Sequence, residues 1–242
     1  MPRRSTPCSR LPQRTLLARL AGALAVLACG LGPAGEASAQ TGVWRQIALP
    51  GAGANAVAGG DSGTVLAVST AGLFRYDGLR VRRLPIFSTR TDSLDGTTVL
   101  QARNGDIWFG TSNQGLFRLR PDGVVDRYTA ASGIGNSAND EILDLAEAPN
   151  GDIWAGTNLG GLSRFNGVAW TSLTTDQGLP SMTVRTLAID PRDGSLWAGT
   201  IATGTAAGLV HVVGGAVAAV YDQFTVAFTR NVQSVEIGRA HV

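Results

Sequence analysis

The chain has 242 residues, of which 44% are hydrophobic and 16% charged, so it can bury a core and does not have the composition of a disordered chain. Its 20 basic residues are all arginines and outnumber the 18 acidic residues, but five of them lie within the first 19 positions. From residue 40 onward, 15 basic residues face 17 acidic ones. That balance excludes the basic field of a nucleic-acid-binding protein, so no nucleic-acid partner is expected.

Residues 1–39 have the pattern of a secretory signal peptide. Four arginines precede the apolar stretch Leu16 to Leu31, and Ala37-Ser38-Ala39 fits a small-residue cleavage site. The pattern predicts a periplasmic or extracellular mature chain. The residues before Cys29 resemble a lipoprotein processing site less closely, which leaves lipidation of Cys29 as the alternative. Because Cys8 and Cys29 are the chain's two cysteines, cleavage after Ala39 leaves no thiol for a disulfide, a metal site or a nucleophile.

A phrase of eight residues recurs along the rest of the chain. It reads NGDIWFGT at 104–111, NGDIWAGT at 150–157 and DGSLWAGT at 193–200, and a divergent copy, SGTVLAVS, stands at 62–69. Aligned on Leu66, Trp108, Trp154 and Trp197, the copies are 42, 46 and 43 residues apart. A period in the low forties with strand-like content predicts the blades of a β-propeller.

The third unit gives the clearest division into strands. Residues 141–147, 152–157, 161–165 and 168–174 are predicted as strands A to D of one antiparallel blade. The first hairpin turns at Asn150-Gly151, where both residues can take positive φ. The repeated tryptophan falls in strand B of units two to four, with Leu66 at this position in unit one, and it is predicted to fill the wedge between neighbouring blades.

The ends of the repeat region predict an incomplete ring. Gly42 to Leu49 resembles a strand D with no strands A to C before it, and Asn231 to Val235 resembles a strand A with no strand B after it. The predicted fold is therefore all-β: a partial β-propeller over residues 40–235, with four complete four-stranded blades plus partial blades. Residues 236–242 resemble sequencing-adapter read-through and are predicted to be a non-native tail, which makes the chain an N-terminal fragment of a longer protein.

The three phrases, the following GLFRL or GLSRF, and the loop DQGLPSMTVRTL together resemble the two-component regulator propeller repeat family over residues 44–235. This resemblance implies the extracytoplasmic sensor region of a hybrid histidine kinase or a diguanylate cyclase. It further implies a dimeric full-length parent anchored in the inner membrane by a segment absent here. The implied ligand is a small molecule or an oligosaccharide.

The sequence offers little for catalysis. The two histidines are His211, in a predicted strand C, and His241, in the predicted tail, so no serine triad is expected. The acidic run from Asp140 to Glu147 places Asp144 on the opposite side of a strand from Glu141 and Glu147, which argues against a shared metal site. We therefore expect no catalytic residue, no metal and no cofactor in this chain.

Fold-level analogy places a ligand at the end of the propeller where the D–A and B–C loops gather. The polar loop residues predicted to bind it are Arg90, Asn113, Gln114, Asn158 and Asp176. Three functions stay open at this point: a sensing module of a transmembrane signalling protein, a stand-alone secreted propeller that binds a polymer or a protein, and a propeller lyase or lactonase.

Overall fold

The computed structural model describes residues 16–20, 23–27, 46–47, 49, 53–86, 95–135, 140–201, 207–222 and 231–237. They fall into two compact units, Met1–Ala48 and Leu49–Val242. The first unit holds an antiparallel sheet of β1 (Leu16–Leu20), β2 (Ala23–Leu27) and β3 (Gln46–Ile47), in that order. Of the predicted strand D at Gly42 to Leu49, the structure describes Gln46, Ile47 and Leu49, and Gln46 and Ile47 pair with β2. No helix of the described residues is long and apolar enough to cross a membrane.

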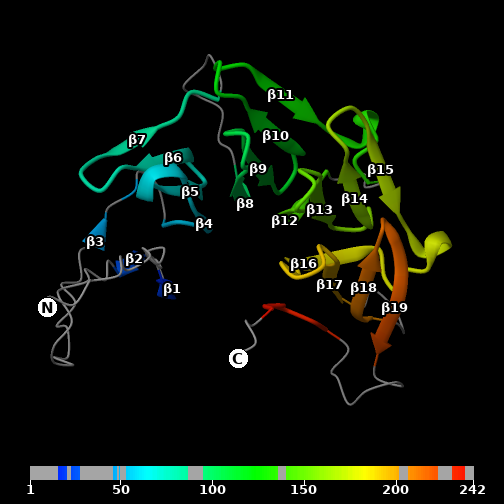
Figure 1. The fold of residues 1–242 in the computed structure, drawn as a ribbon. Coiled ribbons are helices and arrows are strands. Elements are labelled where there is room, and N and C mark those ends of the chain that lie inside the picture. Colours follow the sequence, from blue (N-terminus) through cyan, green and yellow to red (C-terminus); the bar gives the residue numbers. More distant parts are fainter. Residues whose placement is uncertain are drawn as a thin grey trace, which may run out of the picture. The chain divides into compact units, whose positions relative to one another are not determined.

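The second unit contains four four-stranded antiparallel sheets, one for each predicted blade (Figure 1). Blade 1 is β4 (Ala56–Gly59), β5 (Val65–Ser69), β6 (Gly72–Tyr76) and β7 (Val81–Arg83); blade 2 is β8 (Gly96–Gln101), β9 (Ile107–Thr111), β10 (Leu116–Leu119) and β11 (Val125–Tyr128). Blade 3 is β12 (Ile142–Glu147), β13 (Ile153–Thr157), β14 (Leu162–Phe165) and β15 (Trp170–Leu173); blade 4 is β16 (Thr183–Ile189), β17 (Leu196–Ile201), β18 (Gly208–Val213) and β19 (Ala216–Asp222). Short 3-10 turns occupy Asp61–Gly63 (η1), Ala130–Ser132 (η2) and Thr175–Gln177 (η3). The prediction of an all-β fold with four complete four-stranded blades is confirmed.

Successive blades touch through their first strands. β4 contacts β8, β8 contacts β12, and β12 contacts β16, whereas β7, β11, β15 and β19 are the outer strands of their sheets (Figure 1). We call the interface between two consecutive blades a seam. The end of the blades that carries the B–C and D–A loops is called the loop end, and the end that carries the A–B and C–D hairpins is called the turn end.

The glycine of the repeated phrase allows neighbouring blades to pack closely. A Cβ atom on Gly110 would lie 2.7 Å from Ile142 Cβ on the inner strand of the next blade. Gly156 meets Val184 of blade 4 in the same way. The close approach of neighbouring blades therefore requires glycine at these strand B positions.

The first seam reverses this arrangement. Val68 of blade 1 stands where the other blades have glycine, and its partner on the next inner strand is Gly96. A Cβ atom on Gly96 would lie 2.7 Å from Val68 Cβ. The branched residue and the glycine have thus exchanged strands relative to the other seams. This exchange explains how the divergent first copy still packs as a blade.

Residues 231–235 extend the pattern past blade 4. Asn231 forms an isolated antiparallel bridge with Ile201, and the Val232 amide donates to the Thr200 carbonyl over 3.1 Å. A Cβ atom on Gly199 would lie 2.7 Å from Val232 Cγ1. Val232 therefore lies against blade 4 as Ile142 lies against blade 2, which is the position predicted for a further strand A.

The threonine of the phrase caps the B–C loop. The hydroxyls of Thr111, Thr157 and Thr200 donate to the carbonyls of Gly115, Gly161 and Gly208, at 2.8, 2.9 and 2.8 Å. These threonines are at most 1% exposed. Each bond satisfies a buried hydroxyl and fixes the start of strand C.

The Asn-Gly hairpin differs from its prediction in one detail. Gly105 and Gly151 have φ of 87° and 90°, but neither Asn104 nor Asn150 is among the described residues with positive φ. The asparagine carbonyl oxygens instead accept from the backbone two residues on, at 3.0 and 3.1 Å. The loop is thus three residues long, with only the glycine left-handed.

The seams hold the three apolar cores of the second unit. The repeated tryptophan occupies equivalent second strands, as predicted, and Trp108 and Trp154 are 2% and 5% exposed beneath the next blade. Trp197 of blade 4 is half-buried. This confirms that the tryptophan fills the wedge between blades, since exposure rises where no further complete blade is described.

Candidate functional site

At the loop end, one predicted site residue joins two blades. Asn158 lies in the B–C loop of blade 3, and its Nδ2 donates to Glu141 Oε2 over 2.6 Å. Its Oδ1 accepts from the hydroxyl of Thr183, the first residue of β16 in blade 4, over 3.2 Å. The next residue, Leu159, is half-exposed with a φ of 64°, a conformation that a leucine rarely adopts. Asn158 is thus fixed at the inner rim of the third seam.

Beside this rim lies a residue that sequence reasoning missed. β12 and β16 each contain a register shift, between Ile142 and Asp144 and between Val184 and Thr186. The unpaired residue in β16 is Arg185, whose side chain is exposed. The same shift occurs in β8 between Gly96 and Thr98, so the bulge is a repeated feature of these first strands, and at this seam it redirects the side chain of Arg185. Strict alternation along the strand hides such an insertion, so the sequence pattern gave no signal for it.

The other predicted site residues do not gather around Asn158. Asp176 lies in η3, is exposed, and no described hydrogen bond joins it to Asn158. Asn113 is exposed in the B–C loop of blade 2, and the Gln114 carbonyl accepts from Arg127 Nε of β11 over 2.8 Å. Arg90 lies outside the described residues. The structure brings all four described residues to the loop end but places only Asn158 at a contact between inner strands.

The acidic run of β12 is divided between two seams. Asp144 Oδ2 accepts from the Leu187 amide of blade 4 over 2.7 Å, whereas Glu147 Oε2 forms an ion pair of 3.2 Å with Arg103 Nε of blade 2. The side chains of Asp144 and Glu147 therefore lie on opposite faces of the sheet, as predicted. Among the described residues, no group of three or more His, Cys, Asp or Glu side chains is placed to hold a metal ion.

A buried ion pair repeats at the turn end. Arg118 Nη2 lies 2.6 Å from Asp106 Oδ2 in blade 2, and Arg164 Nη2 lies 2.5 Å from Asp152 Oδ2 in blade 3. The two aspartates are 3% and 7% exposed. Each guanidinium also covers the repeated tryptophan of its blade, 5.3 Å above Trp108 in blade 2. Because each carboxylate is paired, removing either partner would leave an uncompensated buried charge and destabilise the blade.

His211 takes the place of this arginine in blade 4. It pairs with Trp197 across the strands as Arg118 pairs with Trp108 and Arg164 with Trp154. Its ring stacks on Trp197 with centroids 4.2 Å apart, and its Nε2 is buried without a hydrogen-bond partner among the described residues. The histidine is therefore a packing residue of strand C, in agreement with the sequence-based interpretation.

The comparisons with known proteins show the fold. No family model matches the sequence, and no curated protein matches it. Among solved structures, the extracellular domain of BT3049 from B. thetaiotaomicron, assigned as a hybrid two component system, is similar over 76% of this chain and 24% of its own, with 17% identity and a TM-score of 0.56. This chain therefore spans about a quarter of that extracellular domain.

Two enzymes, or proteins assigned as such, are similar to the same degree. A protein assigned as a gluconolactonase matches over 90% of this chain and 75% of its own, with 15% identity and a TM-score of 0.56. A catalytically inactive histidine-to-alanine variant of virginiamycin B lyase from Staphylococcus aureus, solved with quinupristin, matches over 67% and 53%, with 16% identity and a TM-score of 0.51. At these identities the likeness is one of β-propeller architecture, and it is shared by sensor domains and enzymes alike.

Proposed function

We propose that this chain is the ligand-sensing β-propeller of an extracytoplasmic receptor, part of a transmembrane signalling protein whose output is a histidine kinase or a diguanylate cyclase. The ligand, a small molecule or an oligosaccharide, binds at the loop end of the third seam. The observation that carries the proposal is the position of Asn158, whose amide joins Glu141 of blade 3 to Thr183 of blade 4.

This position suits a sensor because it couples ligand contact to blade packing. A ligand that bonds to Asn158 competes with, or adds to, bonds that hold two blades together. The exposed guanidinium of Arg185, two residues beyond Thr183 in the same strand, adds a donor for a hydroxyl or a carboxylate. Rigid strands that present polar loop residues are typical of recognition sites.

The structural likeness to the extracellular domain of a hybrid two component system is one of fold and is compatible with this proposal, but it does not by itself favour a sensor over an enzyme. The likeness to the lyase makes a propeller enzyme the second candidate. In that lyase, replacing a histidine abolishes catalysis, whereas the one histidine among the described residues here, His211, is stacked under Trp197. The remaining alternative, a stand-alone secreted propeller, would use the same binding surface but would not be joined to a signalling domain.

The test is a thermal-shift screen of the chain from residue 40 against oligosaccharides, sugar acids and amino acids, followed by calorimetric titration of each hit. Asn158→Ala and Arg185→Gln should each weaken a hit at least tenfold, while Leu79→Ala, at an exposed position of the turn end, serves as the control. Undiminished binding in both variants contradicts the assigned site. Turnover of a lactone or of a cyclic depsipeptide by the wild-type chain contradicts the sensor assignment.

A further inference from the structure

The chain contains three Asn-Gly sequences whose chemistry is the same and whose surroundings differ. They lie at 104–105, 150–151 and 166–167. Asparagine followed by glycine is open to spontaneous loss of its side-chain amide, because glycine has no side chain to hinder attack of its backbone nitrogen on the amide carbon. The first two sequences are A–B hairpins of the repeated phrase, whereas the third is the C–D hairpin between β14 and β15. The structure around each hairpin therefore decides which asparagine reacts.

In the two A–B hairpins, the attacking nitrogen is engaged in a hydrogen bond. The Gly105 amide donates to the Ala102 carbonyl and the Gly151 amide donates to the Ala148 carbonyl, both over 2.9 Å. The nitrogen has to lose its proton to become a nucleophile, and a hydrogen bond to a carbonyl holds that proton in place. Breaking this bond adds to the reaction barrier in both hairpins.

The asparagine side chains of the A–B hairpins are held at both ends. Asn104 Nδ2 donates to Asp106 Oδ2 over 2.7 Å, and Asn150 Nδ2 donates to Asp152 Oδ2 over 2.8 Å. The Oδ1 atom of each asparagine accepts from the backbone N–H of the same aspartate. Turning the amide carbon toward the glycine nitrogen would break both bonds, and the bond to the carboxylate is the stronger kind because one partner is charged.

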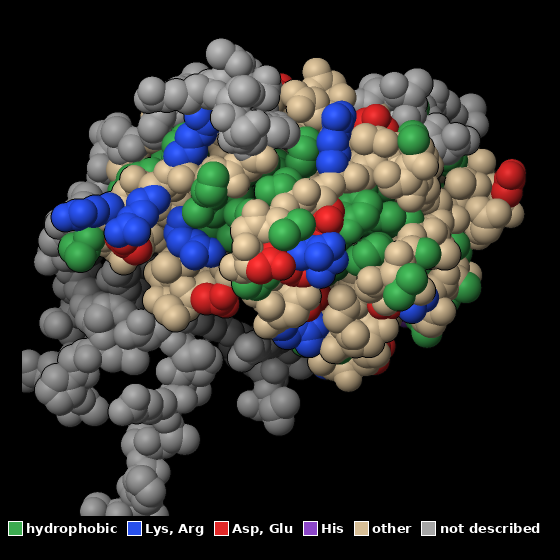
Figure 2. Space-filling model, turned by 90° about the horizontal axis from the view of Figure 1, so that it is seen from above, with side chains coloured by type: hydrophobic (Ala, Val, Ile, Leu, Met, Phe, Trp, Pro, Cys, Tyr) green, Lys and Arg blue, Asp and Glu red, His purple; other side chains and the backbone are tan. Residues whose placement is uncertain are grey.

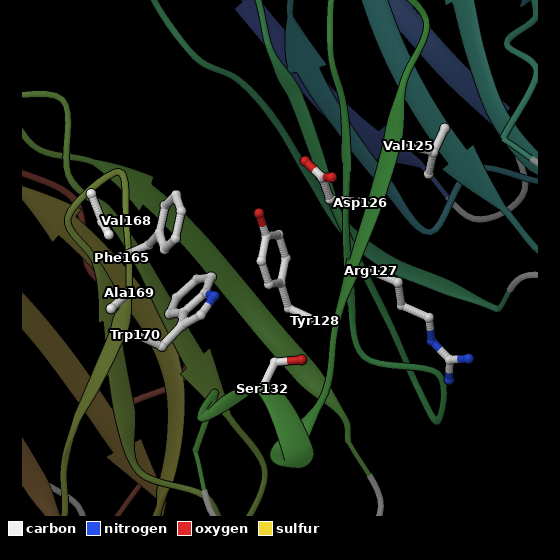
Figure 3. A pocket seen from close by; sticks show the side chains of 9 residues that line it. All are labelled: Val125, Asp126, Arg127, Tyr128, Ser132, Phe165, Val168, Ala169 and Trp170. Carbon is white, nitrogen blue, oxygen red and sulfur yellow. The ribbon is translucent and has the colours of Figure 1, made fainter.

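The C–D hairpin of blade 3 leaves its reacting groups accessible. Within the described part of the chain, no group accepts a hydrogen bond from the Gly167 amide or from Asn166 Nδ2. Both residues are exposed, and a Cβ atom built on Gly167 would meet nothing within 4 Å. Figure 3 shows the segment that continues from this hairpin, with Val168 and Ala169 ahead of Trp170. A base in solvent can therefore reach the Gly167 N–H.

The bonds that restrain the Asn166 side chain are weaker than those in the A–B hairpins. Asn166 Oδ1 accepts from the amides of Val168 and Ala169, over 3.0 and 2.9 Å. Both donors are neutral backbone groups, whereas Asn104 and Asn150 each have one bond to a carboxylate. Rotating the side chain of Asn166 into the reactive geometry therefore costs less.

We propose that Asn166 is a site of spontaneous, non-enzymatic deamidation in the folded chain. A base removes the Gly167 amide proton, the nitrogen bonds to Asn166 Cγ, and the Cγ–Nδ2 bond breaks, so that Nδ2 leaves as ammonia after taking a proton from water. Water then opens the cyclic succinimide. Cleavage between the Gly167 nitrogen and Cγ gives aspartate, and cleavage between that nitrogen and the main-chain carbonyl carbon gives isoaspartate. The net reaction consumes one water, releases one ammonia and involves no oxidation or reduction.

Blade 1 shows that the aspartyl product fits this turn. Its C–D hairpin has Asp77 where blade 3 has Asn166, and a glycine follows in both. Asp77 Oδ1 accepts from the amides of Leu79 and Arg80, over 2.9 and 2.7 Å. The carboxylate thus makes the same two bonds as the amide of Asn166. The aspartyl form of the chain should therefore keep its fold.

The isoaspartyl product should disturb blade 3 more. Its extra backbone methylene lengthens the hairpin between β14 and β15, next to the position where Phe165 pairs with Trp170. The new charge matters less, because the face in Figure 2 already carries interspersed arginine and acidic side chains and a further carboxylate is ordinary on such a surface. This modification is separate from the loop-end site proposed above and does not depend on it.

The test incubates the folded chain at pH 7 and at pH 9 and follows each Asn-Gly sequence by peptide mapping with mass spectrometry, which separates asparagine, aspartate and isoaspartate. Asn166 should react about tenfold faster than Asn104 and Asn150, and its rate should rise with pH because the attacking nitrogen must lose a proton. In the same chain unfolded in guanidinium chloride, the matched control, the three rates should agree within about threefold. Asn166→Gln keeps an amide but disfavours the cyclic intermediate, so it should abolish the reaction at this position.

The proposal is overturned if the three asparagines of the folded chain react at equal rates, or if Asn104 or Asn150 reacts faster than Asn166. It is also overturned if Asn166 reacts in the unfolded chain but not in the folded one, because the hairpin would then protect it. Formation of aspartate without isoaspartate would exclude the succinimide route.

Discussion

The imidazole of His211 lies on the indole of Trp197, with ring centroids 4.2 Å apart and an angle of 17° between the planes. In blades 2 and 3 the same place is held by an arginine that is paired with a buried aspartate. Blade 4 has Ser195 where those blades have Asp106 and Asp152. Blade 4 thus lacks both the aspartate and the arginine, whereas blade 1 keeps the arginine as Arg75 and has Thr64 at the aspartate position.

This relationship predicts a favourable coupling when the pair is restored in blade 4. Ser195→Asp alone buries a carboxylate, and His211→Arg alone places a guanidinium over Trp197 without its counter-charge. The free energy of unfolding of the double variant should therefore exceed the value expected from adding the two single changes by about 2 kcal/mol. Urea unfolding of the four proteins in a double-mutant cycle measures this coupling. Additivity within about 0.5 kcal/mol would show that the positions are independent.

The exchange of valine and glycine at the first seam predicts a rescue at the second. Gly110→Val should destabilise the chain by roughly 2 kcal/mol or more, because the new side chain meets Ile142 and Thr98. Adding Ile142→Gly and Thr98→Ala copies the first seam, where Val68 faces Gly96 and Ala56.

The triple variant should be more stable than the sum of its single changes, measured by chemical unfolding. The control is Ile142→Gly alone, which leaves an unfilled gap and should be destabilised. If the free energy of unfolding of the triple variant only equals the value expected from adding its single changes, the two seams differ in backbone spacing and not in side-chain volume.

Asp190 predicts a loss of stability in acid. Its side chain accepts from Arg192 Nε and from the Arg192 amide, both at 2.9 Å. These bonds, the side-chain bond first, lower the pKa of Asp190 from 3.8 to about 2 in the folded chain. Because the folded pKa is depressed, the contribution of Asp190 is present above about pH 4 and is lost as the pH falls toward 2.

Asp190→Asn should therefore flatten the fall of the thermal midpoint between pH 4 and pH 2 relative to the wild type. Arg192→Gln keeps the carboxylate but removes its main partner, so it should flatten the same region. Unchanged pH profiles in both variants would show that this ion pair makes no difference to folding.

Local features of the fold could be predicted from the sequence because the phrase repeats them. The A–B hairpins, the second-strand tryptophans and the blade register follow from short-range spacing alone, and the structure confirms them. The turn detail at Asn150 was wrong because an asparagine side chain can hold the loop by accepting a backbone bond, without positive φ.

The site was harder to predict because its geometry depends on neighbouring blades. Asn158 stands out only through its bonds to Glu141 and Thr183, which lie 17 and 25 residues away. Tyr128 and Trp170 meet across the second seam and carry no shared motif, so this aromatic contact has no signal in the sequence. Arg185 was missed because a one-residue bulge changes which side of the strand it faces.

The pairing of Val68 with Gly96 has a consequence for assembly. Repeat proteins built from near-identical modules risk joining the wrong neighbours while they fold, since every junction offers the same surface. Blade 1 has Val68 where the other blades have glycine. Docking it beside Ile142 or Val184 would therefore bring two branched side chains into steric clash. The reversed contact therefore favours blade 2, which carries Gly96, as the neighbour of blade 1.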